Sequence, residues 1–226
     1  MARKLNALGL ALIAALALGG LTAVAASANH IDSGAPPNGT THVTGSQIGI
    51  NQFDTPVGPI VCNEAKYDAT FPGNTKPGGI TLKPTFGACM AFGIPATVDT
   101  NNCGILVTTP TIVNPFDTDH FDAVTHIECA EGGGPIQITV GDPVVQCTID
   151  IYPGTPTNPT TDLTNNTAAA PWDIALKWTL EGIHYKTTPE HGSPCGTPGT
   201  MKLTGEVTLK AFADAAHMIQ VPLWVT

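Results

Sequence analysis

Hydrophobic and polar residues alternate along most of this chain. In the clearest case every second residue from Trp172 to Leu180 is apolar, and residues 219–225 follow the same pattern. Alternation of this kind is typical of a strand with one buried face, and no long segment has the period of a helix. The sequence predicts strands over residues 46–52, 58–71, 80–86, 95–102, 103–109, 123–129, 134–140, 145–151, 172–185, 201–210 and 219–225.

About ten short strands separated by Gly and Pro turns indicate an all-β fold, either an antiparallel β-sandwich or a barrel-like sheet, stapled by disulfides. The alternation shifts by one residue after Gly182, which predicts a β-bulge. We expect one domain over residues 45–226, preceded by a flexible polar leader at 29–44. Residues 153–171 are rich in Pro, Thr and Asn, and we expect a long loop there, with an interdomain linker as the alternative.

The first 28 residues have the organisation of a secretory signal peptide. Met1 to Lys4 form a short basic start, residues 5–26 are almost all apolar or small, and Ala26-Ser-Ala28 is a small-x-small cleavage site. The apolar run is also long enough to be a transmembrane anchor, which is the alternative. We expect cleavage after Ala28, a secreted or extracellular protein, and no insertion into the membrane after cleavage.

The chain is acidic, with 9 Lys and Arg residues against 18 Asp and Glu residues. Loss of Arg3 and Lys4 with the signal peptide would lower the formal net charge from −9 to −11. Such a surface repels phosphate backbones and anionic lipid headgroups. Nucleic acids are therefore not expected as partners, whereas a cell-surface or glycan ligand is compatible with this charge.

The six cysteines all follow the expected cleavage site. An even number in an exported chain predicts three disulfides, and the absence of a Cys-x-x-Cys pair disfavours zinc. Cysteines at opposite ends of one strand lie too far apart to bond, which argues against a Cys89–Cys103 pair. The favoured pairs are Cys62 with Cys89, Cys103 with Cys129 and Cys147 with Cys195, and a rival set joins Cys129 with Cys147.

Five stretches of cysteine contexts and turn residues occur together: Gly58-Pro-Ile-Val-Cys62, residues 82–98, Asn102-Cys103, Ile127-Glu-Cys129 and Gly182-Ile-His-Tyr185. Together they resemble a group of exported six-cysteine, Thr/Gly-rich β proteins of actinobacteria. The resemblance covers most of the chain after the signal peptide and implies a bacterial, secreted β protein, and it carries over no activity or ligand. The chain departs from the group in residues 153–171 and in Glu131-Gly-Gly-Gly134.

The densest polar cluster is Asp117-Thr-Asp-His-Phe-Asp122. Asp117, Asp119 and Asp122 could gather carboxylate oxygens for Ca²⁺, which takes six to eight oxygen ligands. The spacing lacks the glycine and the distal glutamate of an EF-hand loop. These acids would equally make a hairpin loop soluble and cap its turns. No other cofactor is expected.

Aromatic residues offer a possible ligand site. Trp172 and Trp178 share the apolar face of their predicted strand, which indicates the core, whereas Trp224 is out of phase with residues 219–225 and is the better candidate for binding a ligand. No Gly-x-Ser-x-Gly elbow is present. Four glutamates fall on predicted strands and could supply the two carboxylates of a glycosidase, although solvated strand faces commonly carry glutamate: Glu64, Glu128, Glu181 and Glu206.

No catalytic motif is visible, so the sequence favours a non-enzymatic secreted module with a structural or binding role in the envelope or extracellular space. A secreted glycan-acting hydrolase that uses strand carboxylates is the first alternative. A calcium-stabilised adhesin-like domain is the second.

Overall fold

The computed structural model describes residues 29–73, 75–114, 117–141, 146–154, 156–157, 159–168, 170–188 and 195–226. These residues form strands, turns and bends without a helix, as the sequence predicts. Among them no helix has the length and apolar character needed to cross a membrane. The strands are β1 (Ile31–Ser33), β2 (Thr40–Gln47), β3 (Asn51–Thr55), β4 (Gly58–Pro72), β5 (Gly79–Ala91), β6 (Ile94–Asp99), β7 (Cys103–Asn114), β8 (Asp117–Cys129), β9 (Ile136–Gly141), β10 (Gln146–Ile151), β11 (Thr160–Asn166), β12 (Asp173–Thr188), β13 (Gly199–Phe212), β14 (Gln220–Val221) and β15 (Leu223–Val225).

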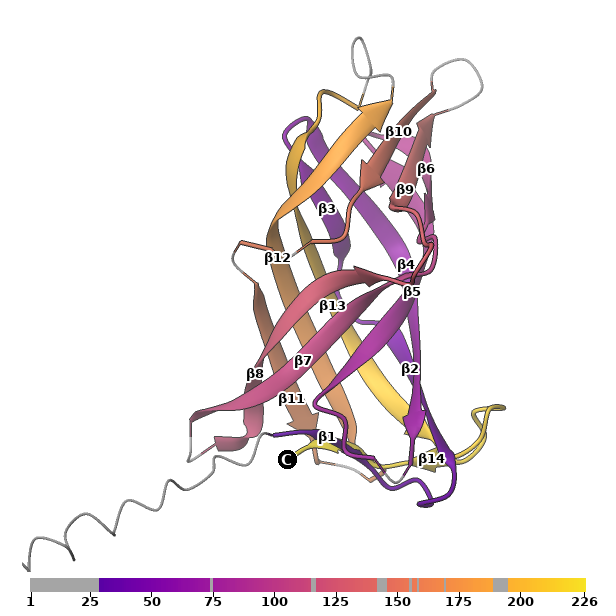
Figure 1. Cartoon of the computed structure of the whole chain (residues 1–226), viewed down its shortest axis with the longest axis vertical. Helices are drawn as coiled ribbons and strands as arrows, with labels where there is room; N and C mark the ends of the chain where they lie inside the picture. The colour runs from indigo at the N-terminus through magenta and orange to yellow at the C-terminus, as the bar shows by residue number, and fades with distance from the viewer. Residues whose placement is uncertain are drawn as a thin grey trace, which may run out of the picture.

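All strands except β1 and β15 belong to one antiparallel sheet, and this sheet closes on itself. In the described part of the chain, its lower half runs in the order β5-β7-β8-β11-β12-β13-β2-β4 and closes where β4 pairs with β5 (Figure 1). The upper half runs β4-β5-β6-β9-β10-β12-β13-β3 and closes where β3 pairs with β4. The four long strands β4, β5, β12 and β13 are shared by both halves. The closed sheet corresponds to the barrel-like form of the predicted all-β fold.

Alternating side chains fill the inside of the closed sheet. Three large aromatic residues, Phe53, Tyr67 and Trp178, are fully buried there. Tyr67 meets Trp178 edge to face at a centroid distance of 5.5 Å, and burial raises the pKa of its phenol. Gly205 makes room for this cluster, because a Cβ at that position would lie 2.3 Å from Cζ2 of Trp178. The apolar stripe of 172–185 is therefore the core stripe from Ile174 onward.

The bulge predicted at Gly182 is present. Leu180 pairs with Leu203 and Ile183 with Met201, so β12 carries one residue more than β13 at this point. Gly182 has a φ of +74°, in the left-handed region that favours glycine. The extra residue restores inward alternation for the upper part of β12, which the upper half of the sheet requires.

The three disulfides follow the sequential pairing that the sequence favours. They join Cys62 to Cys89, Cys103 to Cys129, and Cys147 to Cys195. The first two link residues that face each other directly on neighbouring strands, β4–β5 and β7–β8. The third links β10 to the segment just before β13.

Three segments differ from the predictions. Residues 29–44 are not a flexible leader, because they contain β1 and most of β2, and Ile31 is fully buried. Residues 153–171 are not a continuous loop, because β11 lies within them and pairs with both β8 and β12. The strand predicted over 46–52 is interrupted by the turn between β2 and β3. In β11 the inward positions include Thr161 and Asn165, so no apolar period marks the strand.

Candidate ligand site on the terminal clasp

β1 and β15 form a small two-stranded sheet, here called the terminal clasp, at one end of the closed sheet (Figure 1). The backbone N–H groups of His30 and Thr226 each donate to the carbonyl of the other residue at 3.0 Å. Ile31, Leu223 and Val225 point inward and belong to the main hydrophobic core. The clasp therefore covers the end of the sheet with its inner face and leaves an outer face available.

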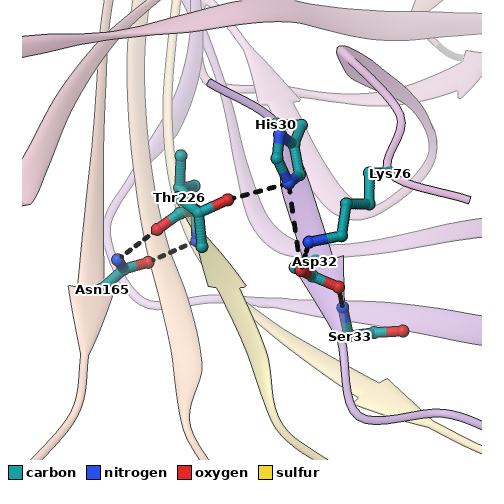
Figure 2. A network of polar contacts seen from close by, with 7 residues as sticks. His30, Asp32, Ser33, Lys76, Asn165 and Thr226 are labelled. Carbon is teal, nitrogen blue, oxygen red and sulfur yellow. Dashed lines mark hydrogen bonds and ion pairs between the residues drawn. The ribbon is translucent and has the colours of Figure 1, made fainter. Parts of the chain in front are cut away.

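The clasp is fixed to the closed sheet by the Asn165 side chain, which makes the two hydrogen bonds that the backbone of a neighbouring strand would make. The Asn165 side chain, on β11, donates from Nδ2 to the Val225 carbonyl at 2.9 Å and accepts from the Val225 N–H at 2.8 Å (Figure 2). Asn165 is only 8% exposed. On the other strand, the hydroxyls of Ser33 and Thr41 share a buried hydrogen bond of 2.7 Å. These polar contacts set the position of both clasp strands.

The outer face of the clasp carries a network of polar side chains (Figure 2). The Lys76 ammonium forms an ion pair with the Asp32 carboxylate at 2.7 Å, and the Ser33 N–H donates a hydrogen bond to the same carboxylate at 3.0 Å. Nε2 of His30 lies 3.9 Å from the Asp32 carboxylate and 3.0 Å from the Thr226 hydroxyl. Both Asp32 and His30 remain partly exposed, with side chains 17% and 26% accessible. The network offers a carboxylate, an ammonium group and an imidazole within one small area.

An aromatic pair adjoins this network. Trp224 lies directly opposite Asp32 in the clasp register, and its ring meets that of Trp172 edge to face at a centroid distance of 5.8 Å. The Leu223 N–H donates to the Trp172 carbonyl at 3.1 Å and holds the two segments together. Trp172 is 38% exposed, against 1% for Trp178. The prediction that Trp172 lies in the core was wrong, because β12 begins only at Asp173 and Trp172 precedes its inward alternation.

Two of the three predicted calcium ligands, Asp119 and Asp122, do not come together. Asp119 and Asp122 lie three residues apart on β8, so their side chains point to opposite faces of the strand. Asp122 faces Asp162 across the sheet, which adds a second outward carboxylate but no closed set of oxygen ligands. The side chain of Asp117 lies outside the described residues. Among the residues whose side chains are described, no group of three His, Cys, Asp or Glu could hold a metal ion.

The four candidate glutamates lie on four different strands, β4, β8, β12 and β13. Glu206 lines a shallow surface depression of about 400 Å³ in which Lys177 faces it directly and Asp162 faces Lys177 from the other side. Asp162 and Glu206 are therefore two strand spacings apart, roughly 10 Å. The four glutamates therefore lie on separate strands. The row of Asp162, Lys177 and Glu206 was not identified from the sequence.

Sequence reasoning identified Trp224 but missed its neighbours. Asp32 lies in the segment taken for a leader, and Lys76 lies in a turn, so neither has a motif around it. The signal that could have found the clasp is the alternation of Ile31 and Ser33 with polar residues. Three residues are too few to stand out in a polar stretch.

No protein-family model, no curated protein and no solved structure matches this chain. The function proposed below therefore rests on the residues of the clasp.

Proposed function

We propose that this protein is a secreted, non-enzymatic module that binds saccharide chains of the cell envelope through the outer face of the terminal clasp. The observation that carries the proposal is the Trp172–Trp224 pair beside the Asp32–Lys76 ion pair. Ligand sites combine apolar or aromatic surface with a few placed polar groups, and this face has both. The resemblance to exported six-cysteine proteins and the signal-like N-terminus favour the same compartment.

The chemistry of the two indole rings suits a sugar. Trp224 and Trp172 stand at 86° to each other, so together they form a corner rather than a flat plate. A pyranose ring presents apolar C–H groups on its faces and hydroxyls around its rim. An indole can cover such a face, while the carboxylate of Asp32 accepts hydrogen bonds from hydroxyls and Lys76 donates to ring or hydroxyl oxygens.

The three disulfides support a role outside the cell. Three disulfides persist where the environment is oxidising and are rare where thiols are kept reduced. A site at the end of a rigid closed sheet needs little ordering on binding, which favours recognition of extended, repetitive ligands.

The test is titration of the purified protein with soluble mannan, arabinogalactan and β-glucan, each followed by calorimetry and by tryptophan fluorescence. We expect one of them to quench the fluorescence of Trp172 and Trp224, and Trp224→Ala to weaken binding at least about tenfold, as loss of a central aromatic contact does. The matched control is Tyr152→Ala, which removes a partly buried ring that contacts Lys186 rather than the clasp. Equal affinity for Trp224→Ala and the unaltered protein, or no binding to any of the three, would count against the proposal.

A secreted glycan-acting hydrolase is the second candidate, and the Asp162–Lys177–Glu206 row is the observation that favours it. Inverting hydrolysis requires two carboxyl groups that lie far enough apart to hold the sugar ring and the attacking water between them. Release of reducing ends from the same three polysaccharides, lost in both Asp162→Asn and Glu206→Gln, would assign the protein to this class. Binding without release of reducing ends would support the module.

A further inference from the structure

The lower ends of β4 and β5 separate from each other. The two strands pair from Ile60 and Ala91 down to Asp68 and Lys83, and there the pairing ends. Below this point residues 69–72 of β4 pair with β2, while residues 79–82 of β5 pair with β7. Figure 1 shows the lower part of β5 leaning towards β7 and away from β2 and β4. In the described part of the chain, no strand pairs with the facing edges of these two segments.

A surface pocket of about 400 Å³, here called the slot, lies where the strands separate. Its apolar floor includes Phe71 and Ile80, which are 7% and 5% exposed. Thr70 and Thr81 alternate with these residues and point outward. The lining consists of Asp68, Ala69, Thr70, Phe71, Gly79, Ile80, Thr81 and Lys83.

Along each edge of the slot, backbone N–H and C=O groups of the strand point towards the opening. In an extended strand, successive residues direct their N–H and C=O groups alternately to the two sides. Each edge is four residues long, about 13 Å at the rise of a strand. Had the pairing continued, Thr70 would face Thr81, two steps beyond Asp68 and Lys83. Such edges bind other extended chains through main-chain hydrogen bonds.

We propose that the slot is a binding site for an extended peptide segment of a partner protein, which would enter as a short added strand. An inward apolar side chain of the peptide would contact Phe71 and Ile80, and the flanking polar side chains would lie beside Thr70 and Thr81. A peptide fits this site better than a sugar or an acyl chain, because only a peptide backbone matches the alternating donors and acceptors of both edges. At the end where β4 and β5 pair, the carboxylate of Asp68 and the ammonium of Lys83 offer one negative and one positive group to outward side chains of the peptide.

The probe is the capped pentapeptide acetyl-Thr-Val-Thr-Val-Thr-amide at roughly 1 mM, a concentration that detects weak complexes. Its effect is measured by amide hydrogen exchange on the whole protein. We expect exchange to slow about tenfold at the slot-facing amides of residues 69–71 and 79–82, with no change on β9 and β10. The matched peptide control carries N-methyl groups on both valines, which removes backbone donors and keeps the side chains.

A cross-linked variant of the protein tests the same site without changing the peptide. Thr70→Cys combined with Thr81→Cys, joined by a short bismaleimide, closes the slot across its outer face. Lys66→Cys combined with Thr85→Cys, joined in the same way, spans the same two strands where they are paired. The protection by the pentapeptide should disappear in the first variant and persist in the second.

Three results would overturn the proposal. They are the absence of protection from exchange at the slot, equal protection by the N-methylated peptide, and protection that persists in the variant cross-linked between positions 70 and 81. Protection that appears without peptide and grows with protein concentration would assign the slot to a second copy of this chain instead.

Discussion

The carboxamide of Asn165 and the backbone of Val225 form the two hydrogen bonds that a neighbouring strand would otherwise supply. Val225 makes no backbone hydrogen bond to β1, because the hydrogen bonds between the two clasp strands are made at the neighbouring pair, His30 and Thr226. The N–H and C=O of Val225 therefore face β11, where a single side chain satisfies both. The last strand of the chain depends on this residue for its position.

Replacement of Asn165 by alanine should lower the free energy of unfolding by about 2–4 kcal/mol, because it leaves two buried backbone groups without partners. Urea unfolding followed by circular dichroism measures the loss. Asn166→Ala is the matched control, since the neighbouring side chain is exposed and its removal should change stability by less than about 0.5 kcal/mol. Similar losses for the two variants would show that the Val225 contacts contribute little.

Gly205→Ala should disturb the aromatic core. The added methyl would lie 2.3 Å from Cζ2 of Trp178 and 2.5 Å from Oδ1 of Asn51, so these side chains must shift. We expect a loss of about 3 kcal/mol and a changed near-ultraviolet circular dichroism spectrum. Gly78→Ala provides the control, because a Cβ there meets nothing within 4 Å. An unchanged spectrum for Gly205→Ala would mean that the core is looser than its packing indicates.

Each disulfide should contribute stability mainly by restricting the unfolded chain. For separations of 26 and 48 residues, the chain-entropy relation gives about 3.5 kcal/mol for Cys103–Cys129 and about 4 kcal/mol for Cys147–Cys195. Double replacement of either pair by alanine, followed by denaturant unfolding, measures these values. A much smaller effect for both pairs would indicate that the unfolded chain remains compact in their absence.

The loop before β14 should open in acid. The carboxylate of Asp214 accepts hydrogen bonds from the N–H groups of Ile219 and Met218, and the Ile219 bond is the main reason that the pKa of this group lies below its usual range. A lowered pKa in the folded state means that the contribution is present above the ordinary value of 3.8 and is lost as pH falls through the folded value. The amide signals of Met218 and Ile219 in a nuclear magnetic resonance titration report this loss directly.

Asp214→Asn should reproduce part of the acid effect at neutral pH, because a carboxamide accepts more weakly than a carboxylate. Asp68→Asn, which alters an exposed acid on β4, should leave both amide signals in place. If the Met218 and Ile219 signals do not move while the Asp214 carboxylate becomes protonated, the loop is held by other contacts.

Much of the fold could be predicted where a strand buries apolar residues. The stripe that contains Trp178, the bulge at Gly182 and the hairpin pairs of cysteines all follow from local alternation and spacing. The missed strands β1 and β11 bury polar residues next to a single apolar one, Ile31 or Leu163. Thr161 donates to the Thr125 hydroxyl at 2.8 Å inside the sheet, so a residue type that usually indicates the surface points inward here.

The candidate site was harder to predict because its parts come from segments that are far apart in the sequence, around residues 32, 76, 172 and 224. Asp32 and Trp224 are neighbours only through the clasp register, and local patterns contain no information on that pairing. Trp224 could be singled out because its phase differs from that of Leu223 and Val225. Closure of the sheet likewise depends on pairings between distant segments, such as β3 with β13.

The four strands that run through both halves of the closed sheet have a mechanical consequence. A molecule built from two stacked modules could be cut between them at a single connecting segment, but here any such plane crosses β4, β5, β12 and β13. Tension or thermal opening at the clasp end is therefore transmitted along continuous backbone to the opposite rim. We expect the two ends to unfold together in one transition, so that neither half exists as a folded fragment by itself.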